Sequence, residues 1–440
     1  MKLRFFGTDG VRGAYGSEKM NESLAHSLGL SIGKYLLESG LHSQNILLGR
    51  DPRPSGESLQ KACAAGIVQS GHHPWDAGIL PTPALSFGVR KLKMSLGVMI
   101  TASHNPSSDN GLKLFSSKGA KFSLSEEARI EELLHENKGD LSATSEFKSV
   151  DIKKDYLEYI CGFFPENALV GKRFVLDTAN GATCQTTPEA FTRLGAKITT
   201  IHSGDGSINH RCGSESMDSL RQEVQERTVD LGVAHDGDGD RARFVDFSGK
   251  VIEGDKILGL LAAMADRKKN LKNKGFVATV HSNSGLLESL SSIGIKLHRA
   301  QVGDRNVSEL MDATGCNWGG ESSGHVLAHD YLPTGDGLFT ALCIANEIKS
   351  GESILASTNW IELWPSRSDS FQVSSKIPLE DCVEIQNALD DAKIKLSKNG
   401  RVLLRYSGTE PKIRLLVEAK NQHLIDEIFP NIMGLLQKAL

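Results

Sequence analysis

Three short apolar runs, each closed by a polar turn, constrain the fold of this chain more than any other feature. The runs cover residues 45–49, 173–176 and 275–280, and each turn leads into an amphipathic stretch. Short apolar runs bounded by turn residues are typical of buried strands, and strands that alternate with helices favour parallel sheets. The sequence therefore predicts three α/β units of one design.

The C-terminal part of the chain has a different pattern. Residues 366–370 resemble a linker, and the runs 371–373, 402–406 and 413–417 are strand-like. The polar region 136–155 could bridge the first two units. We predict an α/β fold with three similar mixed α/β domains and a smaller C-terminal α+β domain, bounded at residues 1–150, 151–254, 255–365 and 366–440.

Ser103 is the first candidate for chemistry. The apolar run 96–100 has the character of a buried parallel strand, and it leads into a tight polar turn at residues 101–106. In open α/β sheets ligands collect at the carboxyl ends of strands, so a serine hydroxyl in this turn is well placed to act as a nucleophile. A turn serine that caps the next segment is the structural alternative.

A second motif favours the chemical interpretation. Asp236, Asp238 and Asp240 alternate with glycines after the apolar run 231–234. In an extended segment residues i, i+2 and i+4 face one side, so the carboxylates would converge while the glycines let the backbone curve. Three like charges so close need a cation. Carboxylate oxygens are hard ligands that prefer Mg²⁺ or Ca²⁺. When the protein supplies only part of the coordination shell and a phosphate oxygen completes it, Mg²⁺ is favoured. A phosphoryl group on Ser103 would supply that oxygen.

Three other interpretations fit the acidic motif less well. An EF-hand loop that starts at Asp236 needs glycine sixth and glutamate twelfth, where this chain has Arg241 and Phe247. A dinucleotide-binding fingerprint over 237–242 would set carboxylates against a pyrophosphate, and residues 243–252 resemble a hairpin instead of a helix. A solvated acidic turn stays open as the structural alternative.

Two further clusters suit a phosphorylated sugar. Residues 319–325 combine glycines with an acceptor, hydroxyls and an imidazole, a mixture that can hydrogen-bond a ring with several hydroxyls or an amine. Residues 405–414 combine backbone amides near Gly408, two hydroxyls and two guanidinium groups, which can surround a phosphate. A glycine-rich surface loop and a hairpin turn are the respective structural alternatives.

Together these clusters resemble the α-D-phosphohexomutase superfamily across nearly the whole chain. The resemblance rests on residues 6–13, 101–106, 109–113, 236–241, 320–325 and 405–414, which occur in the family's order. Residues 7–13 and 407–411 favour its glucosamine branch over its glucose and mannose branches. Ser322 and Tyr406 depart from that branch, which often has glutamine or alanine at the first position and usually proline at the second.

The resemblance implies a mechanism and an architecture. It implies a phosphorylated Ser103, with Mg²⁺ bridging that phosphate and Asp236, Asp238 and Asp240. Two phosphoryl transfers through a 1,6-bisphosphate would interconvert the 6- and 1-phosphates of glucosamine, for UDP-N-acetylglucosamine and cell-wall precursor synthesis. Glucosamine or glucose 1,6-bisphosphate would be the intermediate or activator. The four domains would surround a central cleft, with residues 366–370 as a hinge for the last domain.

The same resemblance implies roles for the remaining candidates. Lys113 is favoured as general acid and base, with a pKa lowered by a neighbouring cation, and His104 would assist it. Arg12 and Arg241 would steady the transferring phosphate. Two sets would bind substrate: Glu321, Ser323 and His325 at the sugar, and Arg405, Ser407, Gly408, Thr409 and Arg414 at the phosphate that is not being transferred.

Composition agrees with this class of enzyme. The chain has 440 residues and a net charge of −4, which gives no general attraction to nucleic acid. Seven cysteines without a Cys-x-x-Cys pair suggest reduced thiols, and no run approaches the roughly 20 apolar residues that span a bilayer. We expect a cytoplasmic enzyme that binds a small phosphosugar, without nucleic acid or membrane partners, and with a homodimer as one possible assembly. A phosphatase, a catalytically silent phosphosugar sensor and a glucose or mannose phosphomutase stay open as alternatives.

Overall fold

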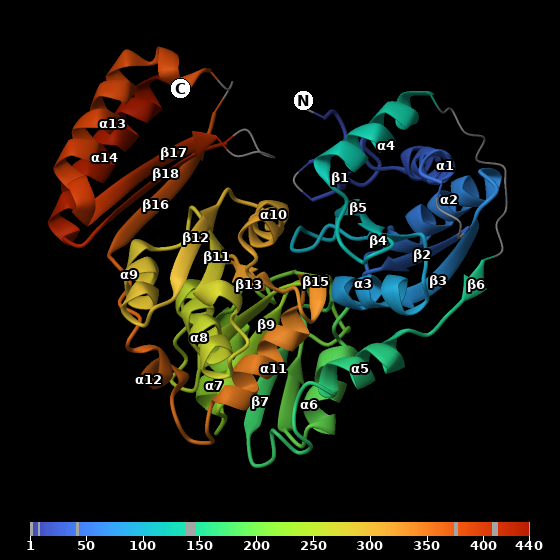
Figure 1. Ribbon diagram of the computed structural model, residues 1–440, viewed down its shortest axis with the longest axis horizontal. Coiled ribbons are helices and arrows are strands. Elements are labelled where there is room, and N and C mark those ends of the chain that lie inside the picture. Colours follow the sequence, from blue (N-terminus) through green and yellow to red (C-terminus); the bar gives the residue numbers. More distant parts are fainter. Residues whose placement is uncertain are drawn as a thin grey trace. The chain divides into compact units, whose positions relative to one another are not determined.

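The computed structural model describes residues 3–7, 9–40, 44–136, 147–373, 377–406 and 412–439. The chain divides into two compact units, whose helices and strands are labelled in Figure 1. The first unit comprises Met1–His281 and Leu297–Asn359, and the second comprises Ser282–Lys296 and Trp360–Leu440. The first unit contains three sheets and the candidate chemistry described below.

The first sheet has six strands in the order β1-β5-β4-β2-β3-β6. Their bounds are β1 Val11–Ala14, β2 Asn45–Arg50, β3 His73–Ile79, β4 Leu96–Ile100, β5 Asp109–Ser116 and β6 Lys148–Ser149. Strand β2 runs parallel to β3 and β4, whereas β5 runs antiparallel to β1 and β4. The carboxyl ends of β2 and β4 therefore meet at one edge of the sheet, which is where ligands collect in such folds.

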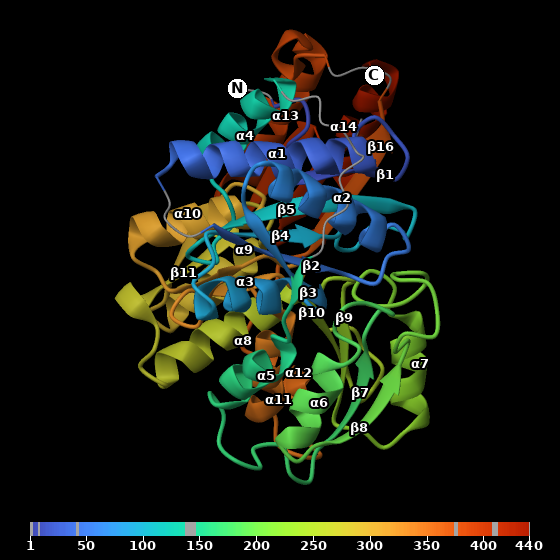
Figure 2. The same cartoon turned by 90° about the vertical axis from the view of Figure 1, so that its right-hand side faces the viewer.

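Helices cover both faces of this sheet. Figure 2 shows α1 (Glu22–Glu38) and α2 (Gly56–Gln69) on one face and α3 (Thr82–Lys91) on the other. Helices α1, α2 and α4 (Leu124–Glu136) share one buried apolar cluster with the strands. A Cβ atom at Gly29 would lie 2.1 Å from the carbonyl oxygen of Cys63, so the glycine is what lets α1 and α2 pack this closely.

The second sheet has four strands in the order β10-β9-β7-β8. Strand β7 (Arg173–Asp177) runs parallel to β8 (Lys197–Ile201) and β9 (Leu231–His235), and β10 (Ala242–Asp246) returns antiparallel to β9. Every residue of β9 is buried, which is why residues 231–234 form a continuous apolar run in the sequence. Its helices are α5 (Lys153–Cys161), α6 (Thr186–Arg193) and α7 (Asp218–Glu226).

The third sheet has five strands in the order β12-β11-β13-β14-β15. The strands are β11 Gly275–Thr279, β12 Lys296–Ala300, β13 Trp318–Gly320, β14 Val326–Ala328 and β15 Leu332–Gly335. The parallel pair β11 and β13 continues into antiparallel pairs with β14 and β15. The neighbouring helices and the short helical turn are α8 Gly254–Arg267, η1 Lys272–Lys274, α10 Asp304–Thr314, α11 Gly337–Glu347 and α12 Ile354–Thr358.

The second unit is built on a three-stranded antiparallel sheet with the order β16-β18-β17. The strands are β16 Ser366–Gln372, β17 Gly400–Tyr406 and β18 Lys412–Ala419, and the helical segments are α9 Ser284–Ser292, η2 Leu379–Asp381, α13 Val383–Leu396, η3 Ser397–Asn399 and α14 Gln422–Ala439. Helices α13 and α14 pack their apolar residues against the sheet in one cluster. An antiparallel sheet with helices on it is the α+β arrangement predicted for this end of the chain.

The prediction of a linker at residues 366–370 is wrong. These residues form most of β16, and each one from Ser366 to Gln372 pairs in register with β18. The serine-rich composition resembles a linker because this is an edge strand whose side chains are largely exposed, and pairing with β18 outweighs the weak local propensity. A fully paired strand does not serve as a hinge, so the hypothesis that these residues form a hinge is wrong as well.

The other strand predictions are confirmed. The runs at 45–49, 173–176 and 275–280 are β2, β7 and β11, and the C-terminal runs lie in β16, β17 and β18. The fold class is the predicted one, with three mixed α/β assemblies and a smaller C-terminal α+β assembly. The four domain boundaries stay predictions. Among the described residues, no helix combines the length and apolar content needed to span a membrane.

Candidate active site

Ser103 lies in a tight turn three residues beyond β4 and is almost completely buried, at 1% exposure. Its backbone has a left-handed φ of 52°, which is unusual for a residue other than glycine, and its N–H donates to Thr101 Oγ1 at 2.9 Å. Its hydroxyl donates to Asp236 Oδ2 at 2.6 Å. The strained turn therefore aims the serine hydroxyl directly at the acidic motif of the second sheet.

Arg53 holds this turn in place, and the sequence analysis missed it. Its guanidinium is fully buried and lies 3.0 Å from Asp51 Oδ2. It donates to four carbonyl oxygens of the serine loop, those of Ser103 at 2.9 Å, Asn105 at 2.8 Å, Asp109 at 2.9 Å and Pro106. The signal was present, because residues 51–53 follow β2 directly and lie at the same sheet edge as Ser103.

The three aspartates converge as predicted, but for a different geometric reason. Carboxylate oxygens of Asp236, Asp238 and Asp240 lie within 4.8 Å of one another. The segment is a turn and not an extended strand, since the N–H of Gly239 donates to the carbonyl oxygen of Asp236 at 3.1 Å and Gly239 has a φ of 73°. The glycine thus curves the backbone around the carboxylates, which is the part of the prediction that holds.

The donor set of this turn fits a hard divalent cation. All three carboxylates are buried, and Asp238 Oδ1 accepts no hydrogen bond from any residue that the structure describes. Burial, followed by the charges of Asp240 and Asp238, raises the pKa of Asp236 well above its usual value. Buried like charges with free oxygen ligands are stabilised by Mg²⁺ or Ca²⁺, both of which prefer oxygen.

Lys113 lies among these carboxylates on β5 and is 1% exposed. Its Nζ atom is 2.8 Å from Asp238 Oδ2, 3.0 Å from Asp9 Oδ2 and 3.5 Å from Asp240 Oδ2. Burial disfavours the charged amine, but the three carboxylates outweigh it and raise the pKa of Lys113 above its usual value. The expectation of a lowered pKa is therefore wrong in this structure, because acidic neighbours dominate over the basic ones.

The same lysine belongs to a closed ring of side chains with alternating charge. The ring runs through Asp9, Lys113, Asp240, His325, Asp304 and Lys121 and returns to Asp9. His325 Nδ1 lies 3.4 Å from Asp240 Oδ1, and His325 Nε2 lies 3.5 Å from Asp304 Oδ2. Lys121 Nζ closes the ring at 2.6 Å from Asp9 Oδ1. Burial lowers the pKa of the ring's imidazole, yet the two flanking carboxylates raise it overall and favour the imidazolium. The ring ties the first sheet to the acidic turn and to the start of α10.

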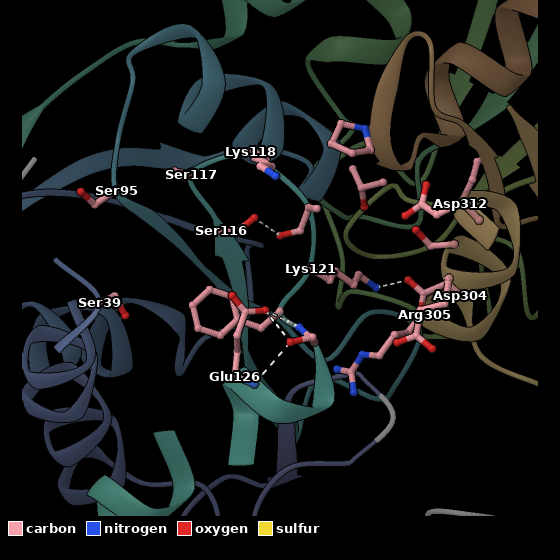
Figure 3. Close-up of a pocket in the computed structure, with 18 of the residues that line it drawn as sticks. Ser39, Ser95, Ser116, Ser117, Lys118, Lys121, Glu126, Asp304, Arg305 and Asp312 are labelled. Atoms are coloured by element: carbon pink, nitrogen blue, oxygen red, sulfur yellow. Dashed lines mark hydrogen bonds and ion pairs between the residues drawn. The ribbon is translucent and has the colours of Figure 1, made fainter. Parts of the chain in front are cut away.

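Figure 3 shows where this ring meets a neighbouring cavity. The cavity has a volume of about 600 Å³ and lies between the segment after β5 and helix α10. Lys121 reaches across one wall to Asp304, and Arg305 lies beside that pair. Ser103 and the three aspartates of the acidic turn do not line this cavity. Lys121 and Asp304 therefore belong both to the charge ring and to the wall of this cavity.

The structure also brings His104, Arg12 and Arg241 to this region. Burial and then the positive charge of Arg241 lower the pKa of His104 to about 4, so its imidazole is neutral at neutral pH. His104 Nδ1 lies 3.5 Å from Ser103 Oγ. Arg12 pairs with Asp9, and Arg241 Nε lies 3.9 Å from carboxylate oxygens of the acidic turn. Two guanidinium groups and a neutral imidazole thus lie close to the serine and its acidic partners.

The predicted sugar-binding cluster occupies the turn between β13 and β14. Glu321 Oε1 accepts a hydrogen bond from the N–H of Gly303 at 3.0 Å, and the Glu321 N–H donates to the carbonyl oxygen of His325 at 2.8 Å. Ser323 Oγ is buried and forms no hydrogen bond with a described residue. His325 is 3% exposed and belongs to the charge ring, so its first contacts are with carboxylates.

The predicted phosphate cradle is described only in part. Ser407, Gly408 and Thr409 lie outside the described residues. Arg405 and Arg414 are register partners on β17 and β18 in the second compact unit, so both side chains project from the same face of that sheet.

Comparisons with known proteins identify the family of this chain. Sequence models of the four domains of the phosphoglucomutase/phosphomannomutase family match this chain: alpha/beta/alpha domain I at residues 3–140, domain II at 154–249, domain III at 253–360 and the C-terminal domain at 371–435. The fold and the site therefore define a phosphohexomutase, an isomerase that transfers a phosphoryl group. The chain belongs to this family, and relatives that are named phosphoglucosamine mutase match it along its length at 39–40% identity.

One such relative is the phosphoglucosamine mutase of Zymomonas mobilis, which is 39% identical over 447 residues and covers 100% of both chains. Among solved structures, a putative phosphomannomutase from Thermus thermophilus has a TM-score of 0.82 at 22% identity and covers 99% of each chain. The N-acetylphosphoglucosamine mutase of Aspergillus fumigatus, in complex with GlcNAc-6P and magnesium, has a TM-score of 0.68 at 16% identity and covers 100% of this chain and 96% of its own. The two structures support the fold alone.

Proposed function

We propose that this enzyme interconverts glucosamine 6-phosphate and glucosamine 1-phosphate, with Ser103 as the phosphoryl carrier. Relatives that are named phosphoglucosamine mutase match the chain along its whole length. The observation that carries the role of Ser103 is its buried hydroxyl, which donates to Asp236 at 2.6 Å at the end of a parallel strand. A serine held against a cation-binding carboxylate is suited to carry a phosphoryl group.

The chemistry that we propose has two transfers. In the first, the bond between phosphorus and Ser103 Oγ breaks while a bond to the O1 atom of glucosamine 6-phosphate forms, giving the 1,6-bisphosphate. The bisphosphate then turns around, and its 6-phosphoryl group returns to Ser103 Oγ, which leaves glucosamine 1-phosphate. Phosphoryl transfer depends mainly on positioning and on neutralising negative charge, and Arg12 and Arg241 lie close enough to the serine loop to contribute both.

Each transfer also moves one proton. The carboxylates around Lys113 favour its protonated form, so it is suited to protonate Ser103 Oγ as the phosphoryl group leaves. The imidazole of His104 is neutral and lies 3.5 Å from the same oxygen, so it is suited to accept the proton of the attacking sugar hydroxyl. Lys113 is the main acid in this proposal, and His104 assists it.

The acidic turn would hold Mg²⁺ through Asp236, Asp238 and Asp240, together with an oxygen of phosphorylated Ser103. When bound, Mg²⁺ neutralises negative charge on the phosphoryl group. Magnesium is present in the structure of the fungal relative, and the convergence of three buried carboxylates supports it here. Glu321, Ser323 and His325 would bind the sugar. The second phosphate would be bound by Arg405, Ser407, Gly408, Thr409 and Arg414. Glucose 1,6-bisphosphate would serve as activator, since the Aspergillus fumigatus N-acetylphosphoglucosamine mutase has been described in complex with it.

The test is turnover of glucosamine 6-phosphate beside glucose 6-phosphate and mannose 6-phosphate, with Mg²⁺ and a trace of bisphosphate. The enzymes are wild type, Ser103→Ala and the matched control Ser108→Ala, an exposed serine in the same loop. We expect a preference for glucosamine 6-phosphate that disappears only in Ser103→Ala. Preference for glucose or mannose phosphate would identify a sister mutase, and release of inorganic phosphate without an isomer would identify a phosphatase.

A further inference from the structure

Three metal-ligand side chains of different chemistry meet at one edge of the second sheet, and none of them belongs to the acidic turn. Asp177 ends β7, His202 follows β8 and Cys212 lies in the loop before α7. Each offers a ligand atom, and these atoms lie within 4.8 Å of one another. Strands β7 and β8 are parallel, so their carboxyl ends meet at the edge where open α/β sheets bind ligands.

The side chains are held in place by the backbone around them. Asp177 accepts hydrogen bonds from the N–H groups of Ala179 and Gly213, both at 2.9 Å. The N–H of Asn180 donates to the carbonyl oxygen of His202 at 2.7 Å. These bonds connect all three segments that supply the ligand atoms, so the cluster is organised before any ligand arrives, which reduces the entropy lost on binding.

One contact of this cluster already favours positive charge. His202 Nδ1 lies 3.1 Å from Asp177 Oδ2, and the hydrogen bond to this carboxylate raises the pKa of His202. A metal ion bound here would replace the proton between these two atoms and accept an electron pair from each. Asp177 and Cys212 are buried, whereas the His202 side chain is 27% exposed, so an ion can reach the cluster from the imidazole side.

We propose that Asp177, His202 and Cys212 form a binding site for Zn²⁺ or a similarly thiophilic divalent ion, separate from the magnesium site. Oxygen, nitrogen and sulfur ligands together match the borderline-soft character of Zn²⁺, and thiolate is a poor ligand for Mg²⁺. Three protein ligands leave a fourth tetrahedral position for water. Binding replaces the thiol proton of Cys212 and the Nδ1 proton of His202 with the metal, and both protons go to the buffer.

Occupation of this site would stiffen the support of the acidic turn. The N–H of Ala182 donates to the carbonyl oxygen of Gly237 at 2.8 Å, and the N–H of Ser214 donates to that of His235 at 2.8 Å. Asp177 and Cys212 thus lie on two segments that donate hydrogen bonds to the acidic turn and to the end of β9. Zinc at this site acts on the backbone next to the catalytic region without replacing magnesium.

The test uses the full-length enzyme with saturating Mg²⁺, titrated with Co²⁺ as a spectroscopic probe and with Zn²⁺. The variants are Cys212→Ser and His202→Gln, and the matched controls are Cys184→Ser, a nearby cysteine outside the cluster, and His210→Gln, an exposed nearby histidine. We expect a thiolate-to-cobalt charge-transfer band in wild type and both controls, and its loss in Cys212→Ser. Zinc affinity should fall by at least about 10-fold in His202→Gln, and the zinc-induced rise in melting temperature should shrink with it.

Two results would overturn the proposal. One is an unchanged cobalt band and zinc affinity in Cys212→Ser and His202→Gln. The other is a band that is absent from wild type or lost only in Cys184→Ser, which would place any soft metal elsewhere. Because His202 is partly exposed, its variant decides the question even where loss of the buried Cys212 thiol prevents folding.

Discussion

Replacing Arg53 by methionine should destabilise both the fold and the serine loop that this side chain holds in place. The guanidinium donates to four carbonyl oxygens of that loop and pairs with Asp51, and both members of the pair are fully buried. Removing one partner of a buried ion pair costs about 3–5 kcal/mol, because the other charge is left without compensation. We expect a loss of about 4 kcal/mol in unfolding free energy together with poor phosphorylation of Ser103.

The pH dependence of this loss follows from Asp51. Burial already raises the pKa of Asp51 in the folded protein, with the Arg53 charge opposing the rise. Without Arg53 the pKa of Asp51 rises further, so the ionised form destabilises the folded state at neutral pH. Protonation of Asp51 removes that penalty. The difference in unfolding free energy between Arg53→Met and wild type should therefore become smaller as pH falls through the raised pKa of Asp51.

The assay is urea unfolding at neutral and mildly acidic pH, combined with mass measurement of phosphate on Ser103. The matched control is Arg50→Met, because Arg50 donates one hydrogen bond, to Gln60 at 3.1 Å, and should cost about 1 kcal/mol. The double variant Asp51→Asn/Arg53→Met should lose less unfolding free energy than the two single variants together, because it leaves no buried charge without a partner. Arg53→Met with stability within about 0.5 kcal/mol of wild type and normal phosphorylation would refute the reasoning.

Three further predictions follow from the same site. Asp238→Asn should raise the Mg²⁺ concentration for half-maximal activity at least about 10-fold, and full activity at low Mg²⁺ would remove the acidic turn from the mechanism. Lys121→Met opens the charge ring and should lower the unfolding free energy measured in urea by about 3 kcal/mol. Lys118 is an exposed lysine nearby, and the control Lys118→Met should stay within about 0.5 kcal/mol of wild type. Equal effects of the two variants would contradict a role for the ring. Burial raises the pKa of Glu127 from 4.5 to about 7 despite Arg305, so the folded protein holds an extra proton between these values and stability should rise as pH falls through 7. Glu127→Gln should flatten that slope in urea unfolding measured across the same range, and an unchanged slope would count against it.

The sequence predicted the features that local patterns determine. Strands β2, β7 and β11 are apolar runs closed by polar turns, so their periodicity and boundaries are visible without a structure. Ser103 and the acidic turn could be found for the same reason, because each follows a buried strand at the edge where ligands collect. The meeting of Ser103 with Asp236 is a contact between residues 133 positions apart, and it was expected only because the chemistry of one requires the other.

What the sequence could not predict depends on long-range contacts. The direction of the Lys113 pKa shift is set by acidic residues from other sheets and loops, whose distances no local pattern contains. Arg53 resembles an ordinary turn residue until four distant carbonyl oxygens are found around it. Strand β16 was mistaken for a linker because its polar residues face solvent and only its pairing with β18 makes it a strand.

The most direct test of the central claim is transfer of labelled phosphate from the enzyme to sugar in a single turnover. The enzyme is loaded with isotopically labelled phosphate from a bisphosphate, separated from excess label and mixed with glucosamine 6-phosphate and Mg²⁺. We predict that the label begins on the peptide that contains Ser103 and moves to glucosamine 1,6-bisphosphate. Label on another residue, or label released as inorganic phosphate without sugar bisphosphate, would contradict the account.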